Sequence, residues 1–255
     1  MLKHTFMHIQ GIGLKTERKI WQGGIMDWND FLNKQHVVFS DKRDDMIRQE
    51  IEQSRGSLNQ IDYFAKRLPN SEQWRLFNEY RSNLVYLDIE TAPGEFDQSE
   101  ITVIGIYDGN RVKSFINGIN LNEFEIEIAA YDIMVTFNGS NFDIPRLKKA
   151  FPGISLPPSH IDLMFLMKSL GYSGGLKKIE KSFDLRRSPE IDGLNGYDAV
   201  RLWQAYLNGH ESALDRLLDY NAADTVNLQP LMEFAFQGMK EKTLESAFPV
   251  KQFPI

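Results

Sequence analysis

The stretch NLVYLDIETAPGEF, residues 83–96, decides the fold of this chain. It begins with LVYL, the apolar run of a buried strand, and then carries Asp88 and Glu90 on either side of Ile89. Because side chains alternate across a strand with a period of two, the two carboxylates share one face. A core strand that ends on two like charges needs a chemical explanation.

Two carboxylates this close repel each other unless something neutralises them. A bound divalent cation is the usual remedy, and hard oxygen ligands suit Mg²⁺ or Mn²⁺. The alternative is a strand that emerges into solvent, where both acids are simply hydrated. For an isolated D-x-E pattern the hydrated strand is the better interpretation, so a metal site needs support from other segments.

The bulk composition narrows the class of protein. Of the 255 residues, 42% are apolar and 25% are charged, as in ordinary globular proteins. No apolar run reaches the roughly 20 residues that span a bilayer, and the N-terminal residues lack the apolar core of a signal peptide. The sequence therefore predicts a cytoplasmic protein that does not associate with membranes.

The charge and the cysteine count exclude further classes. There is no cysteine, which excludes disulfides, thiolate nucleophiles and cysteine-ligated zinc. The net charge of −6 excludes a generally basic nucleic-acid coat, so any contact with phosphate must come from a local basic face.

The hydrophobic pattern divides the chain into four parts. We expect a small Gly-punctuated unit over 1–40, a helical connecting region over 41–80, an α/β domain over 81–240 and a tail over 241–255. In the α/β part, three antiparallel strands joined by tight turns precede a strand–helix alternation. This order predicts one mixed sheet flanked by helices.

One helix start is predicted from its flanking residues. After Pro69, the segment SEQWRLFNEY has a helical pattern, and either Asn70 or Ser71 is expected to cap it.

A second acidic segment, VTFNGSNFDIPRL, follows the next buried strand. That strand ends at Asn138, and Phe142 and Asp143 then stand where a helix begins. Taken alone, Asp143 would be an N-cap, a role that stabilises a helix by about 1 kcal/mol. Taken alone, Phe142 would be a core residue.

The third segment, LLDYNAADTVNL, lies on an amphipathic helix. Tyr220 and Asp224 are four residues apart and therefore share one helical face. Taken alone, Tyr220 would be a half-buried packing residue and Asp224 a surface charge.

The order of the three segments carries more information than any one of them. D-x-E, N-G-x-x-F-D and Y-x-x-x-D, at intervals of about 50 and 80 residues, resemble the motifs of DEDD-type 3′–5′ exonucleases. The tyrosine indicates the DEDDy subclass of this ribonuclease-H-like superfamily. The segments LPNSEQWRLF, GGLKKIEKSF and GYDAVRLW are similar to bacterial YprB-type ribonuclease-H-like proteins, over roughly residues 65–235.

The resemblance implies a role for each acidic residue. Asp88 would bridge two Mg²⁺ or Mn²⁺ ions, Glu90 and Asp224 would complete the shell of the first ion, and Asp143 would hold the second. Two such ions activate water and stabilise the leaving 3′ oxygen in an in-line displacement. Tyr220 would orient the attacking water, because a phenol with an ordinary pKa near 10 is a poor base at pH 7.

Three residues near the second segment have two interpretations each. Asn138 would contact the nucleotide or brace its loop. Phe142 would pack beneath the site or stack on a terminal base, and packing is favoured. Asp162, at the end of another predicted strand, would be an N-cap rather than a group that supports the metal ligands.

A basic helix offers one expected contact with phosphate. Lys177, Lys178 and Lys181 lie on one predicted helix, and a substrate strand that passes the acids would favour such a face. Glu180 interrupts this cluster, so a solvated charged helix is an equal alternative.

The N-terminal unit offers a second contact. GIGLKTERKI resembles a helix–hairpin–helix element, in which Gly11 and Gly13 would present backbone amides to a phosphate and Lys15 would add charge. Such elements grip the nucleic-acid backbone without reading its sequence. The alternative is a degenerate structural copy, because the unit is short and acidic near its end.

The expected function is a metal-dependent 3′–5′ exonuclease that releases nucleoside 5′-monophosphates from single-stranded DNA or RNA. One alternative is a non-catalytic nucleic-acid-binding or scaffold protein that kept the fold. The other is an endonuclease with the same metal chemistry. The complete set of acids argues against the scaffold, and the Y-x-x-x-D helix favours the exonuclease over the endonuclease.

Overall fold

The computed structural model of the protein describes residues 1–93 and 99–247. The chain divides into two compact units. The N-terminal unit comprises Met1–Ser82 together with the residues from Phe236 onward, and the sheet unit comprises Asn83–Ala235.

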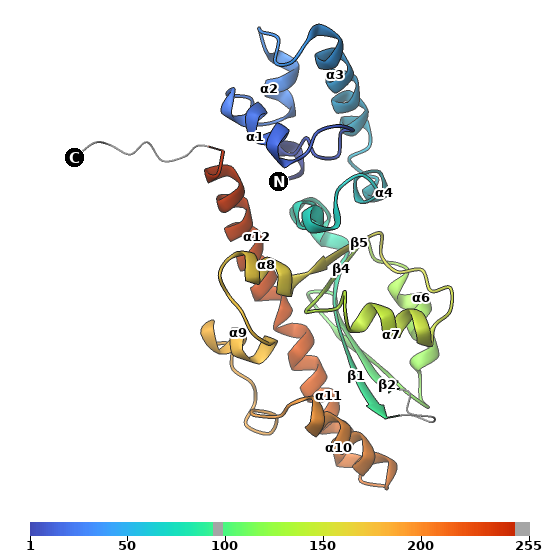
Figure 1. The fold of residues 1–255 in the computed structure, drawn as a ribbon. Helices are drawn as coiled ribbons and strands as arrows, with labels where there is room; N and C mark the ends of the chain where they lie inside the picture. Colours follow the sequence, from blue (N-terminus) through green and yellow to red (C-terminus); the bar gives the residue numbers. More distant parts are fainter. Residues whose placement is uncertain (94–98, 248–255) are drawn as a thin grey trace, which may run out of the picture. The chain divides into compact units, whose positions relative to one another are not determined.

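A single mixed sheet organises the sheet unit (Figure 1). Its strands are β1 (Leu84–Pro93), β2 (Ser99–Tyr107), β3 (Val112–Ile116), β4 (Ile133–Thr136) and β5 (Ser159–Asp162). The spatial order is β3-β2-β1-β4-β5, with β1, β2 and β3 antiparallel and β1, β4 and β5 parallel. The predicted mixed α/β sheet is confirmed. The predicted tight turn between the first two strands lies outside the described residues.

Helices cover both faces of this sheet (Figure 1). The helices of this unit are α6 (Phe124–Ile128), α7 (Asp143–Ala150), α8 (Leu163–Ser169), α9 (Leu176–Ser182), α10 (Gly196–Leu207), α11 (Glu211–Val226) and the first residues of α12 (Leu228–Glu245). Of these, α6 and α7 cover one face of the sheet, and α10 and α11 cover the other. Leu87 and Ile89 of β1 pack on α6 and α7, whereas the opposite face packs on α10 and α11 through Trp203 and Leu217. The central strand β1 is therefore buried on both sides.

The two antiparallel strands next to the acids contain an irregularity. Glu90 pairs with Val103 and Thr91 pairs with Ile101, so Thr102 of β2 is an extra residue. Such bulges are frequent beside active sites, where they re-aim side chains. Here the bulge places Val103 in the core beneath α11 and Ile101 in the core beneath α7.

The N-terminal unit is helical. It contains α1 (Leu14–Gln22), α2 (Trp28–Asn33), α3 (Asp41–Gly56), α4 (Ile61–Ala65) and α5 (Phe77–Tyr80), besides the later turns of α12. The helix α12 continues to Glu245, so the first residues of the predicted tail are helical. Residues 248–255 of that tail lie outside the described residues.

The predicted helix after Pro69 is wrong in type. Residues Asn70–Leu76 form a 3₁₀ helix, and neither Asn70 nor Ser71 caps it; α5 follows directly. Glu72 through Leu76 are all buried, so no polar face remains. Gln73 donates to two backbone carbonyl oxygens, Ala65 O at 2.9 Å and Leu68 O at 3.0 Å. These tertiary contacts override the amphipathic pattern.

No helix in the described part of the chain is both long and apolar enough to cross a bilayer.

Candidate active site

The strand β1 presents Asp88 and Glu90 to the side of the sheet covered by α11. Leu87 and Ile89 point into the opposite core, as the alternation of strand side chains requires. Glu90 is only 7% exposed and Asp88 is partly buried. The hydrated-strand interpretation is therefore wrong, because the strand does not emerge into solvent at these two acids.

Asp224 of α11 completes a cluster with the two acids of β1. One carboxylate oxygen from each of Asp88, Glu90 and Asp224 lies within 4.8 Å of the other two. Three oxygens at this separation form a ligand set that one divalent cation can bridge. Asp224 is 6% exposed, so its interpretation as a surface charge is wrong.

The cluster opens into a pocket of about 330 Å³. Its lining comprises the three acids with Tyr220, Phe142, Ile89, Thr91, Gly196 and Val200. Tyr220 stands one helical turn before Asp224, as the spacing predicts, and is 2% exposed. The pocket thus joins the first and third sequence motifs and the phenylalanine of the second.

Burial and mutual repulsion disfavour the ionised acids. Burial, followed by the charge of Asp224 and then that of Glu90, raises the pKa of Asp88 well above its usual range. Burial, followed by the charge of Asp224, raises the pKa of Glu90 to about 8. Burial also raises the pKa of Asp224, against the opposing effect of Arg187 and Lys177. A cluster of this kind either retains protons or takes up a cation.

Asp143 lies beside this cluster and is 2% exposed. Its Oδ1 accepts a hydrogen bond from the backbone N–H of Ile89 at 3.2 Å, which ties the second motif to β1. Burial raises the pKa of Asp143 to about 7. The N-cap position of α7 is Phe142, without a side-chain cap, so the N-cap interpretation of Asp143 is wrong.

Tyr220 is held by a lysine. Lys177 Nζ donates a hydrogen bond to the Tyr220 hydroxyl oxygen and lies 4.4 Å from the centre of the ring. The same ammonium is 3.8 Å from Asp224 Oδ2. Burial, followed by the charge of Asp224, raises the pKa of Tyr220, so the phenol keeps its proton at neutral pH.

Asp162 organises the loop of the second motif. Its carboxylate accepts from the backbone N–H groups of Asn138 at 2.8 Å and Ser140 at 3.0 Å. It also accepts from Met164 N at 3.2 Å, which confirms the predicted N-cap of α8. Asn138 has a φ of 63°, a backbone conformation that asparagine tolerates, and its Oδ1 accepts from Asn141. The loop is therefore braced from β5.

Phe142 packs as predicted, and stacking on a base stays a prediction. Phe142 packs against the core beneath α7, and it lines the pocket. The guanidinium of Arg146 stacks 3.7 Å from the centre of its ring.

Asn221 is a residue that the sequence motifs do not single out. Its Nδ2 donates to Asp88 Oδ2 at 2.9 Å, and Asn221 itself is fully buried. Gly105 pairs with Asp88 across the sheet, and a Cβ on Gly105 would lie only 2.0 Å from Asn221 Oδ1. The adjacency of Asn221 to Tyr220 on one buried helix, together with a glycine inside a predicted strand, could have indicated this contact.

The predicted nucleic-acid contacts are distributed unevenly. Lys177 reaches Tyr220, whereas Lys178 is exposed and Lys181 lines a neighbouring pocket. Gly11, Gly13 and Lys15 are exposed residues at the start of α1 and belong to the N-terminal unit.

A family model of the RNase_H superfamily matches residues 85–236, more than half of the chain. No curated protein matches the sequence.

Several solved structures have a similar fold. One is the family B DNA polymerase from the hyperthermophilic archaeon Pyrobaculum calidifontis, with a TM-score of 0.47 and 17% identity over 64% of this chain and 26% of that chain. Brucella melitensis NrnC has a TM-score of 0.46 and 18% identity, over 67% of this chain and 81% of that chain. Escherichia coli RNase D, an exoribonuclease involved in structured RNA processing, has a TM-score of 0.46 and 16% identity, over 68% and 46%. This chain spans about a quarter of the polymerase and less than half of RNase D, and these similarities concern the fold alone.

Proposed function

This chain belongs to the RNase_H superfamily, and from that premise we propose that it is a divalent-metal-dependent 3′–5′ exonuclease of the DEDDy type, related to YprB-type proteins. Its substrate would be single-stranded DNA or RNA, and its product nucleoside 5′-monophosphates. The observation that carries this proposal is the buried cluster of Asp88, Glu90 and Asp224, whose ligand oxygens lie within 4.8 Å of one another.

The donor set fits a hard divalent cation. It consists of carboxylate oxygens only, which suit Mg²⁺ or Mn²⁺ rather than zinc. Asp88, Glu90 and Asp224 would hold one ion, and Asp88 with Asp143 would hold a second. When bound, the ions lower the pKa of the attacking water and stabilise the leaving 3′ oxygen.

The residues around the acids would orient the reactants. The Tyr220 O–H stays protonated, because burial raises its pKa, so Tyr220 would position the attacking water rather than deprotonate it. Lys177, which donates to the phenol oxygen, leaves the phenolic proton available for this hydrogen bond. Asn221 would fix the orientation of Asp88.

We place the 3′-terminal nucleotide over Phe142, an aromatic residue in the wall of the pocket. Aromatic stacking holds single strands without regard to sequence. Asn138 would brace the loop that carries Phe142. The exposed Lys178 and Lys181 would contact phosphates further along the strand.

We also propose that the N-terminal unit grips a nucleic-acid backbone. Gly13 occupies the N-cap position of α1, Gly11 has a φ of 79°, and Lys15 is exposed one residue after the helix begins. This arrangement suits a phosphate at the start of a helix. Loss of single-strand affinity in Lys15→Ala, at low ionic strength, would support this contact, and unchanged affinity would contradict it.

The first experiment uses single strands labelled at the 3′ or the 5′ end, in DNA and RNA, with Mn²⁺ or EDTA. We expect early release of the 3′ label as a mononucleotide and a shortening ladder from the 5′-labelled strand. Asp88→Asn should abolish both. Asp219→Asn, an exposed acid on the same helix as Asp224, is the matched control and should retain activity.

Two results would replace the proposal. Cleavage of a circular single strand would indicate an endonuclease, because an exonuclease needs an end. Binding of full-length strands without any shortening would indicate the non-catalytic scaffold.

A further inference from the structure

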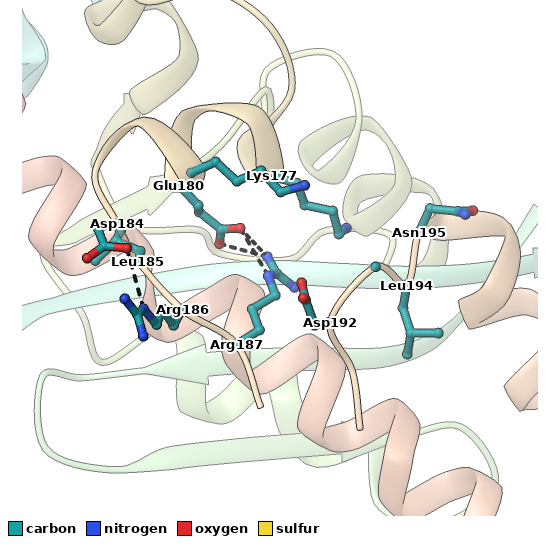
Figure 2. Close-up of a pocket in the computed structure, with 11 residues that line it drawn as sticks. Lys177, Glu180, Asp184, Leu185, Arg186, Arg187, Asp192, Leu194 and Asn195 are labelled. Carbon is teal, nitrogen blue, oxygen red and sulfur yellow. Dashed lines mark hydrogen bonds and ion pairs between the residues drawn. The ribbon is translucent and has the colours of Figure 1, made fainter. Parts of the chain in front are cut away.

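Arg187 lines a pocket of about 390 Å³ (Figure 2) and also reaches the acidic cluster through Asp224. It comes from the segment between α9 and α10, and its side chain is only 4% exposed. Its guanidinium contacts two acids at once, Glu180 of α9 and Asp224 of α11. A buried arginine shared between two elements needs a reason, because burying a charge is costly unless it is paired.

The contact with Glu180 anchors the guanidinium. Arg187 Nε donates to Glu180 Oε2 at 3.0 Å, and Nη2 donates to Oε1 at 2.7 Å, the paired geometry visible in Figure 2. Asn227 Nδ2 donates to the same Oε1 at 2.9 Å. Glu180 is 2% exposed, so both members of the pair are shielded from water. Bidentate arginine–carboxylate pairs fix geometry as well as charge.

The contact with Asp224 leaves this acid able to bind a cation. Arg187 Nη2 donates to Asp224 Oδ1. Asp224 also contributes an oxygen to the cluster with Asp88 and Glu90. A carboxylate that is held through a hydrogen bond in this way loses rotational freedom before any metal arrives.

We propose that Arg187 is the positioning residue for Asp224: Asn227 holds Glu180, Glu180 holds the guanidinium, and the guanidinium holds the Asp224 carboxylate in its metal-binding orientation. The inference rests on the proposed function, because it assigns a role at the same site. Groups that orient metal ligands typically change metal affinity or activity by about 10–100-fold when they are removed.

The other nearby cations lack this geometry. Lys177 Nζ stands 3.8 Å from Asp224 Oδ2, and its side chain is 35% exposed. Arg186 is 85% exposed and pairs with Asp184 at 3.4 Å. Arg186→Gln therefore removes the same charge from the adjacent position and is the matched control.

The test measures Mn²⁺ affinity by calorimetry, without substrate, beside the exonuclease rate as a function of Mn²⁺ concentration. The variants are Arg187→Gln, Arg187→Lys and Arg186→Gln. In Arg187→Gln we expect a loss of about 10–100-fold in Mn²⁺ affinity and a rate that excess Mn²⁺ partly restores. Arg187→Lys should fall in between, and Arg186→Gln should match the wild type.

A further variant addresses the case in which Arg187→Gln does not fold. Arg187→Gln leaves Glu180 buried without its partner, which destabilises proteins strongly. Glu180→Gln with Arg187→Met removes both charges, which proteins tolerate better. Circular dichroism checks whether this double variant is folded. The folded double variant should lose as much Mn²⁺ affinity as Arg187→Gln.

The outcomes separate this inference from the proposed function. A folded Arg187 variant with wild-type Mn²⁺ affinity overturns the positioning role, and so does a variant that binds Mn²⁺ more tightly, because Arg187 would then compete with the metal. A wild type that binds Mn²⁺ but cuts no strand overturns the nuclease proposal while the affinity comparison still decides the role of Arg187. A wild type that binds no Mn²⁺ overturns both.

Discussion

Two buried charge networks, one in each unit, differ in their balance of charge. In the N-terminal unit, Arg75 donates to Glu17 at 2.9 Å and to Glu72 at 2.6 Å. The other oxygen of Glu17 accepts from Thr5 Oγ1 at 2.6 Å and from the backbone N–H of Phe6 at 2.7 Å. Two carboxylates share one guanidinium and several donors.

The network of the sheet unit has a larger excess of negative charge. Among the described residues, the four motif acids and Glu180 are accompanied by Lys177 and Arg187, and Arg146 acts on Asp143. Both networks bury charge, and they differ in how far the carboxylates outnumber the cations. The two carboxylates of the N-terminal network are paired with protein donors, whereas the acids of the sheet unit need protons or a cation from outside.

The largest expected effect comes from removing the cation of the N-terminal network. Arg75→Ala leaves Glu17 and Glu72 buried without their cation, so we expect the free energy of unfolding to fall by about 3–5 kcal/mol. Arg55→Ala removes an exposed pair with Glu52 and should change it by less than about 1 kcal/mol. Urea unfolding followed by circular dichroism measures both. Equal effects of the two variants would show that the buried network contributes little.

Asp88→Asn is expected to have the opposite effect on stability, because it removes one of the carboxylates that repel each other in the sheet unit. Without divalent cations the variant should melt at the same temperature as the wild type or higher, since one of several repelling carboxylates is gone. With Mn²⁺ it should gain little stability and lose more than about a hundredfold in exonuclease rate, beyond the loss typical of groups that only support metal ligands. Thermal melting with EDTA or Mn²⁺ gives the first result, and labelled strands give the second. Full Mn²⁺ stabilisation of Asp88→Asn would contradict the ligand assignment.

Asn221→Ala tests how much the orientation of Asp88 matters. Loss of its hydrogen bond to Asp88 should reduce the exonuclease rate by about 10–100-fold, with partial recovery at high Mn²⁺. Gly105→Ala should give a similar loss by displacing Asn221, because its new Cβ would overlap Asn221 Oδ1. A folded Asn221→Ala with the wild-type rate would restrict Asn221 to a packing role.

The smallest expected effect is a dependence of stability on pH. The pKa of Glu90 is raised to about 8 and that of Asp143 to about 7, both above the values of an unfolded chain. The folded state therefore holds these protons more tightly than the unfolded chain. The stability that they contribute is fully present below the unfolded pKa values, near about 4, and is lost progressively until the pH exceeds about 7–8. In EDTA we expect the melting temperature to fall between pH 5 and pH 8.5, beyond any change in Glu90→Gln/Asp143→Asn.

Mn²⁺ should reverse this trend. Because protons and the cation compete for the same oxygens, stabilisation by Mn²⁺ should grow over the same pH range. A metal effect that is independent of pH would place the bound ion away from these acids.

Much of the fold was predictable because the strand patterns are strong. The alternation around Asp88 and the tight turns between antiparallel strands predicted the mixed sheet. The turn between β2 and β3 is closed by Asp108 Oδ1, which accepts from Asn110 N and Arg111 N at 2.8 Å. The 3₁₀ helix at Asn70–Leu76 was not predictable, since its form depends on partners distant in sequence such as Glu17. Tertiary packing overrides local helix propensity where a segment is buried on all sides.

The sequence by itself determined the sheet and indicated which acids come together. Strand periodicity and helical spacing are local properties, so they can be recognised without knowing the tertiary contacts. Only the tertiary structure decided how these acids are held. The hydrogen bond of Asn221 to Asp88, the shared guanidinium of Arg187 and the bond of Asp143 to the backbone of β1 join residues far apart in the chain. The pKa shifts of Asp88 and Glu90 also depend on burial, which arises only when α11 covers the strand that carries these two acids.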